Sequence, residues 1–307
     1  MINFYKNRKI YFIISSFIIL AGIVAALTMG IKLDIQFQGG SVVKYSYTGT
    51  IDSEEAGALV EATLGKTTTC LEQVTQATGE KTLSVNMADY ESITSQEQEL
   101  ITSTLTTAYP DAGLNFITSQ SVEPSTGARF FRQGILAIFL SFGLILVYVG
   151  YRFRKIGGFS AGFMAIVALF HDAFVVTAVF IIFRIPLNDS FIAAVLTIIG
   201  FSINDTIVIY DRIRENKVTM GSKTSTELLV DTSITQSMTR SINTSVAVFA
   251  SITIVYIFAQ IYNIESIKDF ALPMMFGTIS GCYSTICIAG PLWVMWKNHT
   301  ANKTKKA

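Results

Sequence analysis

Long apolar segments dominate the pattern of hydrophobic and polar positions along this chain. The first runs from Ile10 to Met29 without a single charge. A helix needs about 20 mostly apolar residues, at a rise of 1.5 Å each, to cross a hydrocarbon layer ~30 Å thick. Five further segments of this kind follow residue 130: 134–151, 158–183, 190–209, 241–261 and 270–296. The pattern therefore predicts a polytopic α-helical membrane protein with six transmembrane helices.

The first apolar segment also resembles a secretory signal peptide, because Lys6, Arg8 and Lys9 precede it. Its length exceeds the apolar core of a signal peptide, which has about 7 to 15 residues. No small-residue cleavage site leads from it into a clean mature start. We therefore expect it to be an uncleaved first span.

Residues 31–130 have the pattern of a folded α+β domain between the first and second spans. Strands are predicted at 41–47, 71–75, 81–87 and 114–121, from their β-branched and aromatic residues. Helices are predicted after Ser53, to about Leu64, and over 96–108, with Ser53 and Thr94/Ser95 as the hydroxyl-bearing N-cap residues. The resulting order, βαββαβ, is typical of the ferredoxin-like fold. It contains no visible catalytic group, so we expect a binding or spacer module.

Composition and charge support this division. The chain is 50% hydrophobic and 15% charged, whereas ordinary soluble domains have about 25% charged residues, which excludes an ordinary soluble protein. The net charge of +1 conceals thirteen acids and five bases in residues 31–130. The remaining residues have an excess of bases.

The basic residues also predict how the spans are oriented. Fifteen Lys and Arg residues fall on one side of the six spans, in the N-terminus, the 152–155 loop, the 211–240 loop and the tail. The two short loops of the other side contain only Arg184 and Lys268. Because Lys and Arg are enriched in cytoplasmic loops, both termini are expected in the cytoplasm. The predicted division is 1–30 (N-terminus and first span), 31–130 (extracytoplasmic domain), 131–298 (five-helix bundle with short loops) and 299–307 (basic cytoplasmic tail).

The few cysteines and histidines argue against a metal site. Cys70, Cys282 and Cys287 form no Cys-x-x-Cys pair, and His171 and His299 complete no set of ligands at a workable spacing. We expect no metal, no cofactor and no enzymatic activity.

Polar and ionisable residues inside the apolar segments are the strongest candidates for function. A charge at bilayer depth costs about 2.5 to 3.5 kcal/mol on insertion scales, so it requires an explanation. His171 and Asp172 lie midway along the third span, and Asn204 and Asp205 lie in the fourth. Arg240 begins the fifth span, with Thr244 one turn later.

Two interpretations remain open for these residues. Asp205 and Arg240 form an ion pair that pins two helices, with His171 and Asp172 hydrogen-bonded to neighbouring helices. Alternatively, Asp205 and Arg240 form a proton or ion relay, in which small helix movements load and empty the carboxylate. His171, Asp172, Asn204 and Thr244 are candidates for relay or structural support.

Two further polar segments border the spans. Asp211 to Asn216 (Asp-Arg-Ile-Arg-Glu-Asn) marks the inner end of the fourth span and would serve simply as an interfacial, salt-bridged helix end. Gly and Pro residues in 30–40 and 123–127 connect the acidic domain to the bundle, either as a hinge or as ordinary fixed turns.

Four motifs carry a family resemblance that covers nearly the whole chain. They are Asp34-Ile-Gln-Phe-Gln-Gly-Gly40, His171-Asp172, the specific segment Gly200 to Asn216, and Thr235 to Ser241. With this topology the chain resembles the SecD/SecF family of protein translocase subunits, in the resistance-nodulation-division superfamily, and specifically its SecF members. The matching motif positions are Asp34, Phe37, Gly39, Gly40, Asp211, Arg212, Arg214, Glu215 and Asn216. Gln36, Gln38 and Phe201 depart from the usual residues of the family that this chain resembles.

The resemblance implies a subunit of the bacterial cell membrane that pairs with SecD. It implies that the pair assists the SecYEG channel, in a transient contact, in exporting proteins with the proton-motive force. The family's functional intramembrane aspartate and arginine fall on Asp205 and Arg240. The 31–130 domain is then a candidate for contact with the secreted polypeptide, lipid surrounds the spans, and no nucleic acid is involved. The alternatives are an autonomous exporter of small molecules from the same superfamily and a passive membrane scaffold.

Overall fold

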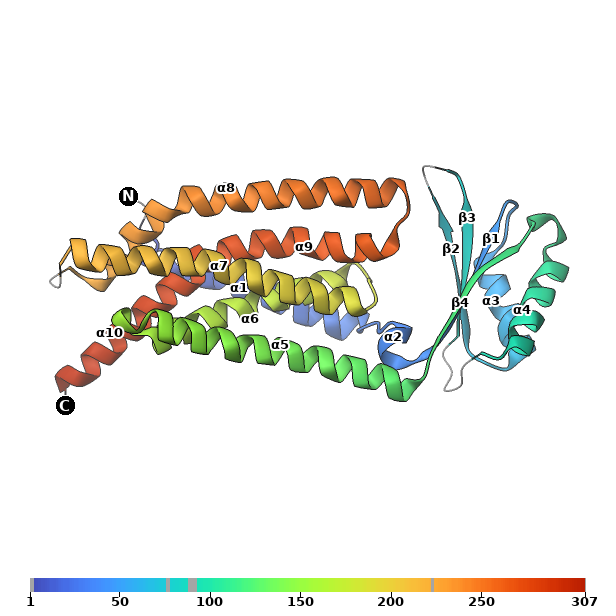
Figure 1. Cartoon of the computed structure of the whole chain (residues 1–307), viewed down its shortest axis with the longest axis horizontal. Coiled ribbons are helices and arrows are strands. Elements are labelled where there is room, and N and C mark those ends of the chain that lie inside the picture. The colour runs from blue at the N-terminus through green and yellow to red at the C-terminus, as the bar shows by residue number, and fades with distance from the viewer. Residues whose placement is uncertain (1–2, 76–77, 88–92, 222–223, 307) are drawn as a thin grey trace.

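The computed structural model describes residues 3–75, 78–87, 93–221 and 224–306. It consists of a long helical bundle with a smaller α+β domain at one end, and both chain termini lie at the opposite end of the bundle (Figure 1). The bundle helices are α1 (Arg8–Met29), α5 (Pro124–Arg152), α6 (Gly158–Ile182), α7 (Asp189–Thr219), α8 (Thr226–Ile261) and α9 (Glu265–Ser284). A π-helical turn, Thr285–Ala289, continues α9 into α10 (Gly290–Lys306).

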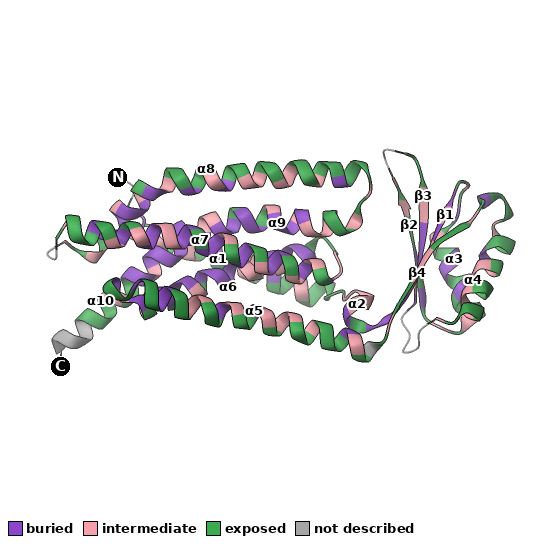
Figure 2. Cartoon of the chain, in the orientation of Figure 1, coloured by how far each residue is buried: buried purple, intermediate pink, exposed green. Residues whose placement is uncertain are grey.

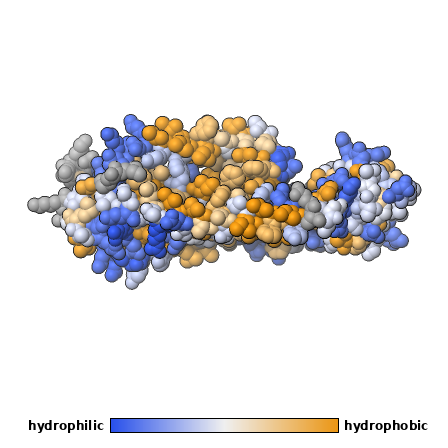
Figure 3. Space-filling model, turned by 90° about the horizontal axis from the view of Figure 1, so that it is seen from above, coloured by the Kyte–Doolittle hydropathy of each residue, from blue (hydrophilic) through white to orange (hydrophobic). Residues whose placement is uncertain are grey.

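Six of these helical segments in the described residues are long and apolar enough to cross a membrane. Large apolar side chains cover the outside of the bundle, as Leu27 (81% exposed) and Phe17 (71%) illustrate. Figure 3 shows this apolar surface along the middle of the bundle and polar surface toward its ends. The prediction of a multi-pass membrane protein with six spans is confirmed.

The 211–240 segment was expected to be a loop, and that expectation is wrong. Helix α7 continues to Thr219 and α8 begins at Thr226, so most of this segment is helical. Ion pairs one turn apart support the polar end of α7: Arg214–Asp211 and Arg212–Glu215, both at 2.9 Å. Ser225 caps α8 by accepting a hydrogen bond from the Leu228 backbone. Helix formation here depends on pairing and capping, whereas the hydropathy pattern recognises only the apolar middle of each helix.

The two connections to the α+β domain are ordered. Pro124 is the first residue of α5, the helix position where a missing N–H costs nothing. The other connection contains the short helix α2 (Ile35–Gln38), and a Cβ on Gly127 would lie 2.9 Å from the Phe37 carbonyl oxygen. The 123–127 segment is therefore a packed helix start. Positive φ angles occur at Gly30, Gly39 and Gly40 in the other connection.

The α+β domain has the element order predicted from the sequence. Its strands are β1 (Gly40–Tyr47), β2 (Thr68–Val74), β3 (Lys81–Met87) and β4 (Asn115–Val122), and its helices are α3 (Ser53–Leu64) and α4 (Ser95–Ala108). The sheet order is β2-β3-β1-β4 with antiparallel neighbours, in registers such as Val43 opposite Val85. Both helices cover the face of the sheet that points away from the bundle (Figure 1). Alternate residues of β1, Val43, Tyr45 and Tyr47, are buried beneath them.

Contacts also join the domain to the bundle. The Asp34 backbone N–H donates to the Leu187 carbonyl oxygen at 3.0 Å, and the Leu187 backbone N–H donates to the Lys32 carbonyl oxygen at 2.8 Å. Glu265, at the start of α9, pairs with Lys44 at 3.6 Å and accepts a hydrogen bond from Gln73. The domain is thus docked on the turn between α8 and α9.

The start of α4 gives a testable pH dependence. Glu97 lies 2.8 Å from Lys66 and completes a capping box with Thr94. The Lys66 hydrogen bond, and next the Thr94 backbone hydrogen bond, lower the pKa of Glu97 from its ordinary 4.5 to about 2. Because the folded-state pKa is depressed, ionised Glu97 stabilises the domain above pH 4.5, and this stabilisation is lost as the pH falls toward 2.

We therefore expect Glu97→Gln, which keeps the capping oxygen, to destabilise α4 at neutral pH by no more than about 1 kcal/mol, as for an exposed ion pair. Hydrogen exchange of the α4 amides in the full chain measures this effect, with the exposed Glu99→Gln on the same helix as the control. The difference in α4 stability between the Glu97→Gln and Glu99→Gln chains should vanish near pH 2. A difference that persists there would contradict an ionic origin.

Candidate functional site

Buried polar side chains form a column through the middle of the bundle. Helices α6, α7 and α9 supply most of them, and these are the most deeply buried helices of the bundle (Figure 2). The buried polar residues at this depth are His171, Asp172, Ser202, Asp205, Thr206, Ser241, Ser245, Thr278, Ser280, Ser284 and Thr285. Two carboxylates, Asp172 and Asp205, are the ionisable centres of this column.

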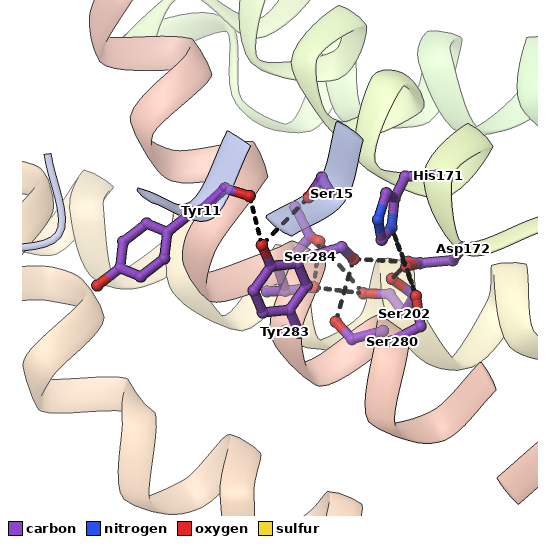
Figure 4. A network of polar contacts seen from close by, with 11 residues as sticks. Tyr11, Ser15, His171, Asp172, Ser202, Ser280, Tyr283 and Ser284 are labelled. Carbon is purple, nitrogen blue, oxygen red and sulfur yellow. Dashed lines mark hydrogen bonds and ion pairs between the residues drawn. The ribbon is translucent and has the colours of Figure 1, made fainter. Parts of the chain in front are cut away.

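Asp172 is fully buried and is surrounded by hydrogen-bond donors from three helices (Figure 4). Ser202 of α7 and Ser284 of α9 donate to Oδ2 at 2.7 and 2.6 Å. Ser280 of α9 donates to Oδ1 at 2.6 Å, and His171 Nδ1 lies 3.3 Å from the same oxygen. Both carboxylate oxygens of Asp172 are therefore occupied by donors from its own helix and from two neighbouring helices.

Small residues make this arrangement possible. A Cβ on Gly281 would lie 3.1 Å from Ser202 Cβ, and one on Gly277 would lie 2.5 Å from Ile198 Cγ1. The Gly277-x-x-x-Gly281 pair therefore brings α9 close to α7, as small residues do between membrane helices. Two further hydroxyls, Thr206 and Thr285, meet at 3.0 Å beyond Ser202.

The π-helical turn lies immediately beyond Ser284 and contains Thr285. Thr285 also donates to the Ser202 carbonyl at 3.3 Å. Tyr283 connects the column to α1, since its hydroxyl donates to the Tyr11 carbonyl at 2.7 Å and lies 3.1 Å from Ser15 Oγ. Single-turn π segments of this kind frequently occur at functional sites.

Asp205 has different surroundings. It lies on α7 one turn beyond Ser202, is 3% exposed, and its Oδ2 atom has no hydrogen-bond partner among the described residues. Arg240 of α8 acts on Asp205 electrostatically, yet the two form no ion pair within 4.0 Å in the described part of the chain. The closed, helix-pinning Asp205–Arg240 pair considered from the sequence is therefore absent here.

The residues around Asp205 on α8 also have few partners. Ser241 is buried and its hydroxyl has no partner within the described residues, while the buried Ser245 hydroxyl meets only the Cys282 thiol. Arg240 is exposed on the surface of this chain, Thr244 is half-buried and Asn204 is exposed. Helix α8 is exposed along much of its length (Figure 2). The structure thus brings Asp205 into the core and leaves Arg240 on a helix face that this chain does not cover.

The Asp211–Asn216 motif lies at the end of α7 remote from the α+β domain. Asp211 pairs with Arg152 of α5 at 3.2 Å, in addition to Arg214. Arg212 donates to Gln236 at 2.7 Å, and Asn216 donates to Ser233 and Gln236 at 2.9 and 2.8 Å. Glu215 pairs with Arg212. The motif therefore fastens the ends of α5, α7 and α8 together.

The Asp34–Gly40 motif lies where the α+β domain meets the bundle. Asp34 caps α2 by accepting a hydrogen bond from the Gln36 backbone at 3.0 Å. Burial raises the pKa of the Asp34 carboxyl, the Gln36 hydrogen bond opposes this, and the nearby Asp189 carboxylate adds to it. Phe37 is buried and packs on Phe131, with ring centroids 5.3 Å apart. Gly39 and Gly40 have φ angles of 83° and 129°, and a Cβ on Gly40 would meet the Met87 carbonyl oxygen at 2.6 Å.

The sequence reasoning missed the serines that surround Asp172. Ser280 and Ser284 are four residues apart and so share a helix face, and this spacing was the only available signal. In the described ranges, no three His, Cys, Asp or Glu side chains gather as metal ligands would.

Comparisons with known proteins agree with this architecture. Residues 101–299 match the family described as "Protein export membrane protein SecD/SecF, C-terminal". The chain is 33% identical to the protein translocase subunit SecF of Alicyclobacillus acidocaldarius, covering 98% of this chain and 94% of that one. It is 31% identical to the protein translocase subunit SecDF of Bacillus subtilis, covering 98% of this chain and 39% of that longer protein.

A crystal structure of SecDF from Thermus thermophilus, named as a translocon-associated membrane protein, has a similar fold. Its TM-score is 0.78 at 26% identity, and the match covers 97% of this chain and 39% of that one. A SecDF structure in a super-membrane-facing form gives a TM-score of 0.69 at 26% identity, over 100% of this chain and 40% of that one. The chain belongs to the SecD/SecF family of protein export membrane proteins, as one of its SecF protein translocase subunits.

Proposed function

We propose that this chain uses the proton-motive force to assist SecYEG-dependent protein export, with Asp205 as the proton-carrying group and Arg240 as its switch. The observation that carries the proposal is the buried Asp205 carboxylate, whose Oδ2 has no partner within the described residues. A buried carboxylate without a partner is costly when charged, so its proton affinity responds strongly to any nearby cation. Movement of Arg240 toward or away from Asp205 then empties or loads the site.

The orientation of the chain follows from its basic residues. Fifteen Lys and Arg residues lie in the segments placed on one side, so we assign that side, with both termini, to the cytoplasm. The 31–130 domain then lies outside the cytoplasm. Its βαββαβ order and its β2-β3-β1-β4 antiparallel sheet support its assignment to the ferredoxin-like class. In this position it is available for contact with an emerging polypeptide.

SecD is the proposed stable partner. The chain covers only 39% of the Bacillus subtilis SecDF protein, so that relative carries a large additional part fused to its SecF-like region. The exposed face of α8, with Arg240, is a surface where such a part would pack. A membrane-embedded arginine facing lipid would be costly, which favours a protein partner there.

Copurification tests this partnership. The full chain, extracted in mild detergent, should copurify with a SecD-like protein in fixed stoichiometry. SecYEG subunits should copurify in a smaller amount, which increases when a crosslinker is added before extraction. A chain that exports small molecules alone would purify without a SecD-like protein. That result would contradict the proposed function.

Docking of the α+β domain gives a further prediction. Cysteines replacing Lys44 and Glu265, in a chain whose native cysteines are alanine, should be bridged by a reducible bifunctional thiol reagent. If the domain must move on its Gly30–Gly40 connection during export, the bridge should stop secretion and reductant should restore it. Secretion is measured as polypeptide released from intact cells or vesicles.

The matched control is a Lys66/Glu97 cysteine pair, which replaces a Lys–Glu ion pair inside the α+β domain. Its bridge should leave secretion unchanged. Equal secretion by the bridged and reduced 44/265 proteins would show that movement of the domain against the α8–α9 turn is not required.

A further inference from the structure

Hydrogen bonds between the helices of the bundle are distributed unevenly. Helices α6, α7 and α9 are tied together by the three serine hydroxyls that donate to Asp172 and by the Thr206–Thr285 contact at 3.0 Å. Tyr210 of α7 adds a hydrogen bond to the Ala161 carbonyl of α6 at 2.9 Å. These bonds cross at mid-membrane depth, where no water competes for the same groups.

Helix α8 has no comparable connection along its middle. Between Ser237 and Ile261, the one hydrogen bond to another helix among the residues that the structure describes joins Ser245 to the Cys282 thiol of α9, and sulfur makes only weak hydrogen bonds. It is fastened near one end by Asn216, which donates to Ser233 and Gln236, and at the other by the short turn into α9. Its middle therefore depends mainly on apolar packing.

Unpartnered polar atoms coincide with this region of few polar contacts. Asp205 Oδ2 on α7 and Ser241 Oγ on the buried side of α8 have no hydrogen-bond partner among the described residues. Ser245, whose hydroxyl meets the Cys282 thiol, borders a cavity of about 370 Å³ between α8 and α9, and Ile286 of the π-helical turn also lines it. Buried polar atoms ordinarily have partners, so unpartnered atoms on both sides of one helix interface are unusual and call for an explanation.

From this contrast we infer that Asp172, Ser202, Ser280 and Ser284 are positioning residues, which hold α6, α7 and α9 as a rigid frame while the middle of α8 moves against it. Ser202 lies one turn before Asp205, so the frame fixes where the Asp205 carboxylate stands. The moving helix carries Arg240. This inference deepens the proposed function and rests on it only in giving the movement a purpose.

The saturated environment of Asp172 fits a fixed role. Three hydroxyls and the His171 ring occupy its two oxygens, so a proton arriving there would displace a donor that is already in place. Asp205 instead has an oxygen without a partner among the described residues. The two carboxylates of the buried polar column therefore have separate tasks, one structural and one that changes its state.

Distances between spin labels test the rigid frame. Two double-cysteine chains are labelled, each in a background whose native cysteines are alanine. One carries labels at Ile182 (α6) and Thr197 (α7), and the other at Thr197 and Ile254 (α8), all of which are exposed positions. The chain is held in lipid nanodiscs with any copurifying partner retained. Asp205→Asn, which mimics the neutral carboxyl, should shift the 197–254 distance by about 2 Å, the scale of helix shifts in switching proteins. The 182–197 distance should stay unchanged.

Variants of the frame complete the test. Asp172→Asn should broaden the 182–197 distance distribution and remove the effect of Asp205→Asn on the 197–254 distance. Ser202→Ala, which removes a single donor, should do the same to a smaller extent and remains informative if Asp172→Asn does not fold. The control is Ser141→Ala on α5, whose hydroxyl donates to Ala137 of its own helix; it should change neither distance.

Any of three results would overturn the inference. The first is a 197–254 distance that Asp205→Asn leaves constant, and the second is a 182–197 distance that Asp205→Asn changes. The third is a 182–197 distance distribution that neither Asp172→Asn nor Ser202→Ala alters. Failure of the proposed function has a different signature. Normal secretion by an Asp205→Asn chain would remove the relay, while the 182–197 distances in the Asp172 and Ser202 variants would still report on the frame.

Discussion

Cells that depend on an Asp205→Asn chain are expected to lose secretion driven by the proton-motive force while accumulating the protein normally in the membrane. The substitution preserves the size of the side chain and much of its hydrogen-bonding capacity, but it removes the group that binds and releases a proton. Because Asp205 is buried and makes no closed ion pair with Arg240 in the described part of the chain, its replacement breaks no strong contact seen there. The rate at which a pulse-labelled secretory protein reaches the outside measures the effect.

The control for this variant is Asp189→Asn, the same chemical change at an exposed position on the same helix. It should secrete at the normal rate. Normal secretion by a normally accumulated Asp205→Asn chain would exclude the relay and favour a passive scaffold.

The second large effect is expected at Arg240. Arg240→Lys should reduce force-driven secretion severely although it preserves the positive charge, because an ammonium group lacks the planar guanidinium fork and loses its proton more easily when buried. Arg240→Met should be at least as harmful, since it leaves Asp205 without a cation to draw its proton away. The same pulse-labelling measurement applies, together with the amount of SecD-like protein that copurifies.

Arg132→Lys, at an exposed position on α5, is the matched control and should be neutral. If Arg240→Lys also secretes normally, a positive charge is sufficient at this position and the guanidinium geometry has no role. If Arg240→Met secretes normally, Arg240 is not part of the switch.

The six spans were predictable because each depends on a single property, the length of an apolar run. The elements of the α+β domain were predictable for a similar reason, since β-branched and aromatic residues such as Val43 and Tyr45 and the capping residues of α4 are local signals. The predicted cap of α3 was wrong: Asp52, not Ser53, accepts the backbone hydrogen bonds there. The extension of α7 to Thr219 was not recognised because its residues are polar, and ion pairs on its own surface replace hydropathy as the reason for helix formation.

The candidate site was predictable only in part. Asp205, Arg240 and Asp172 were identified because a charge in an apolar segment is conspicuous. The serines around Asp172 were not, because a serine in a membrane helix ordinarily bonds its own backbone, as Ser141 does with Ala137. Only the packing of α7 against α9 turns Ser202 and Ser280 toward Asp172.

The exposed position of Arg240 also could not be read from the sequence. Hydropathy places Arg240 at the start of a span but says nothing of which helix face another protein covers. Helix α8 buries little of its surface within this chain, so its sequence lacks a one-sided apolar stripe. Such a stripe would have shown whether Arg240 faces the bundle or points away from it.

The central claim is that protons pass through Asp205 and that their passage advances the secreted polypeptide. Sealed vesicles containing this chain, its copurifying SecD-like partner and SecYEG, with a trapped pH-sensitive dye and a partly translocated polypeptide, allow both events to be followed after a proton gradient is imposed. We predict that the gradient produces proton flow and completes translocation with the unaltered chain, and that the Asp205→Asn chain shows neither. Equal gradient-driven completion with the two chains, or proton flow that persists in the variant, would contradict the account.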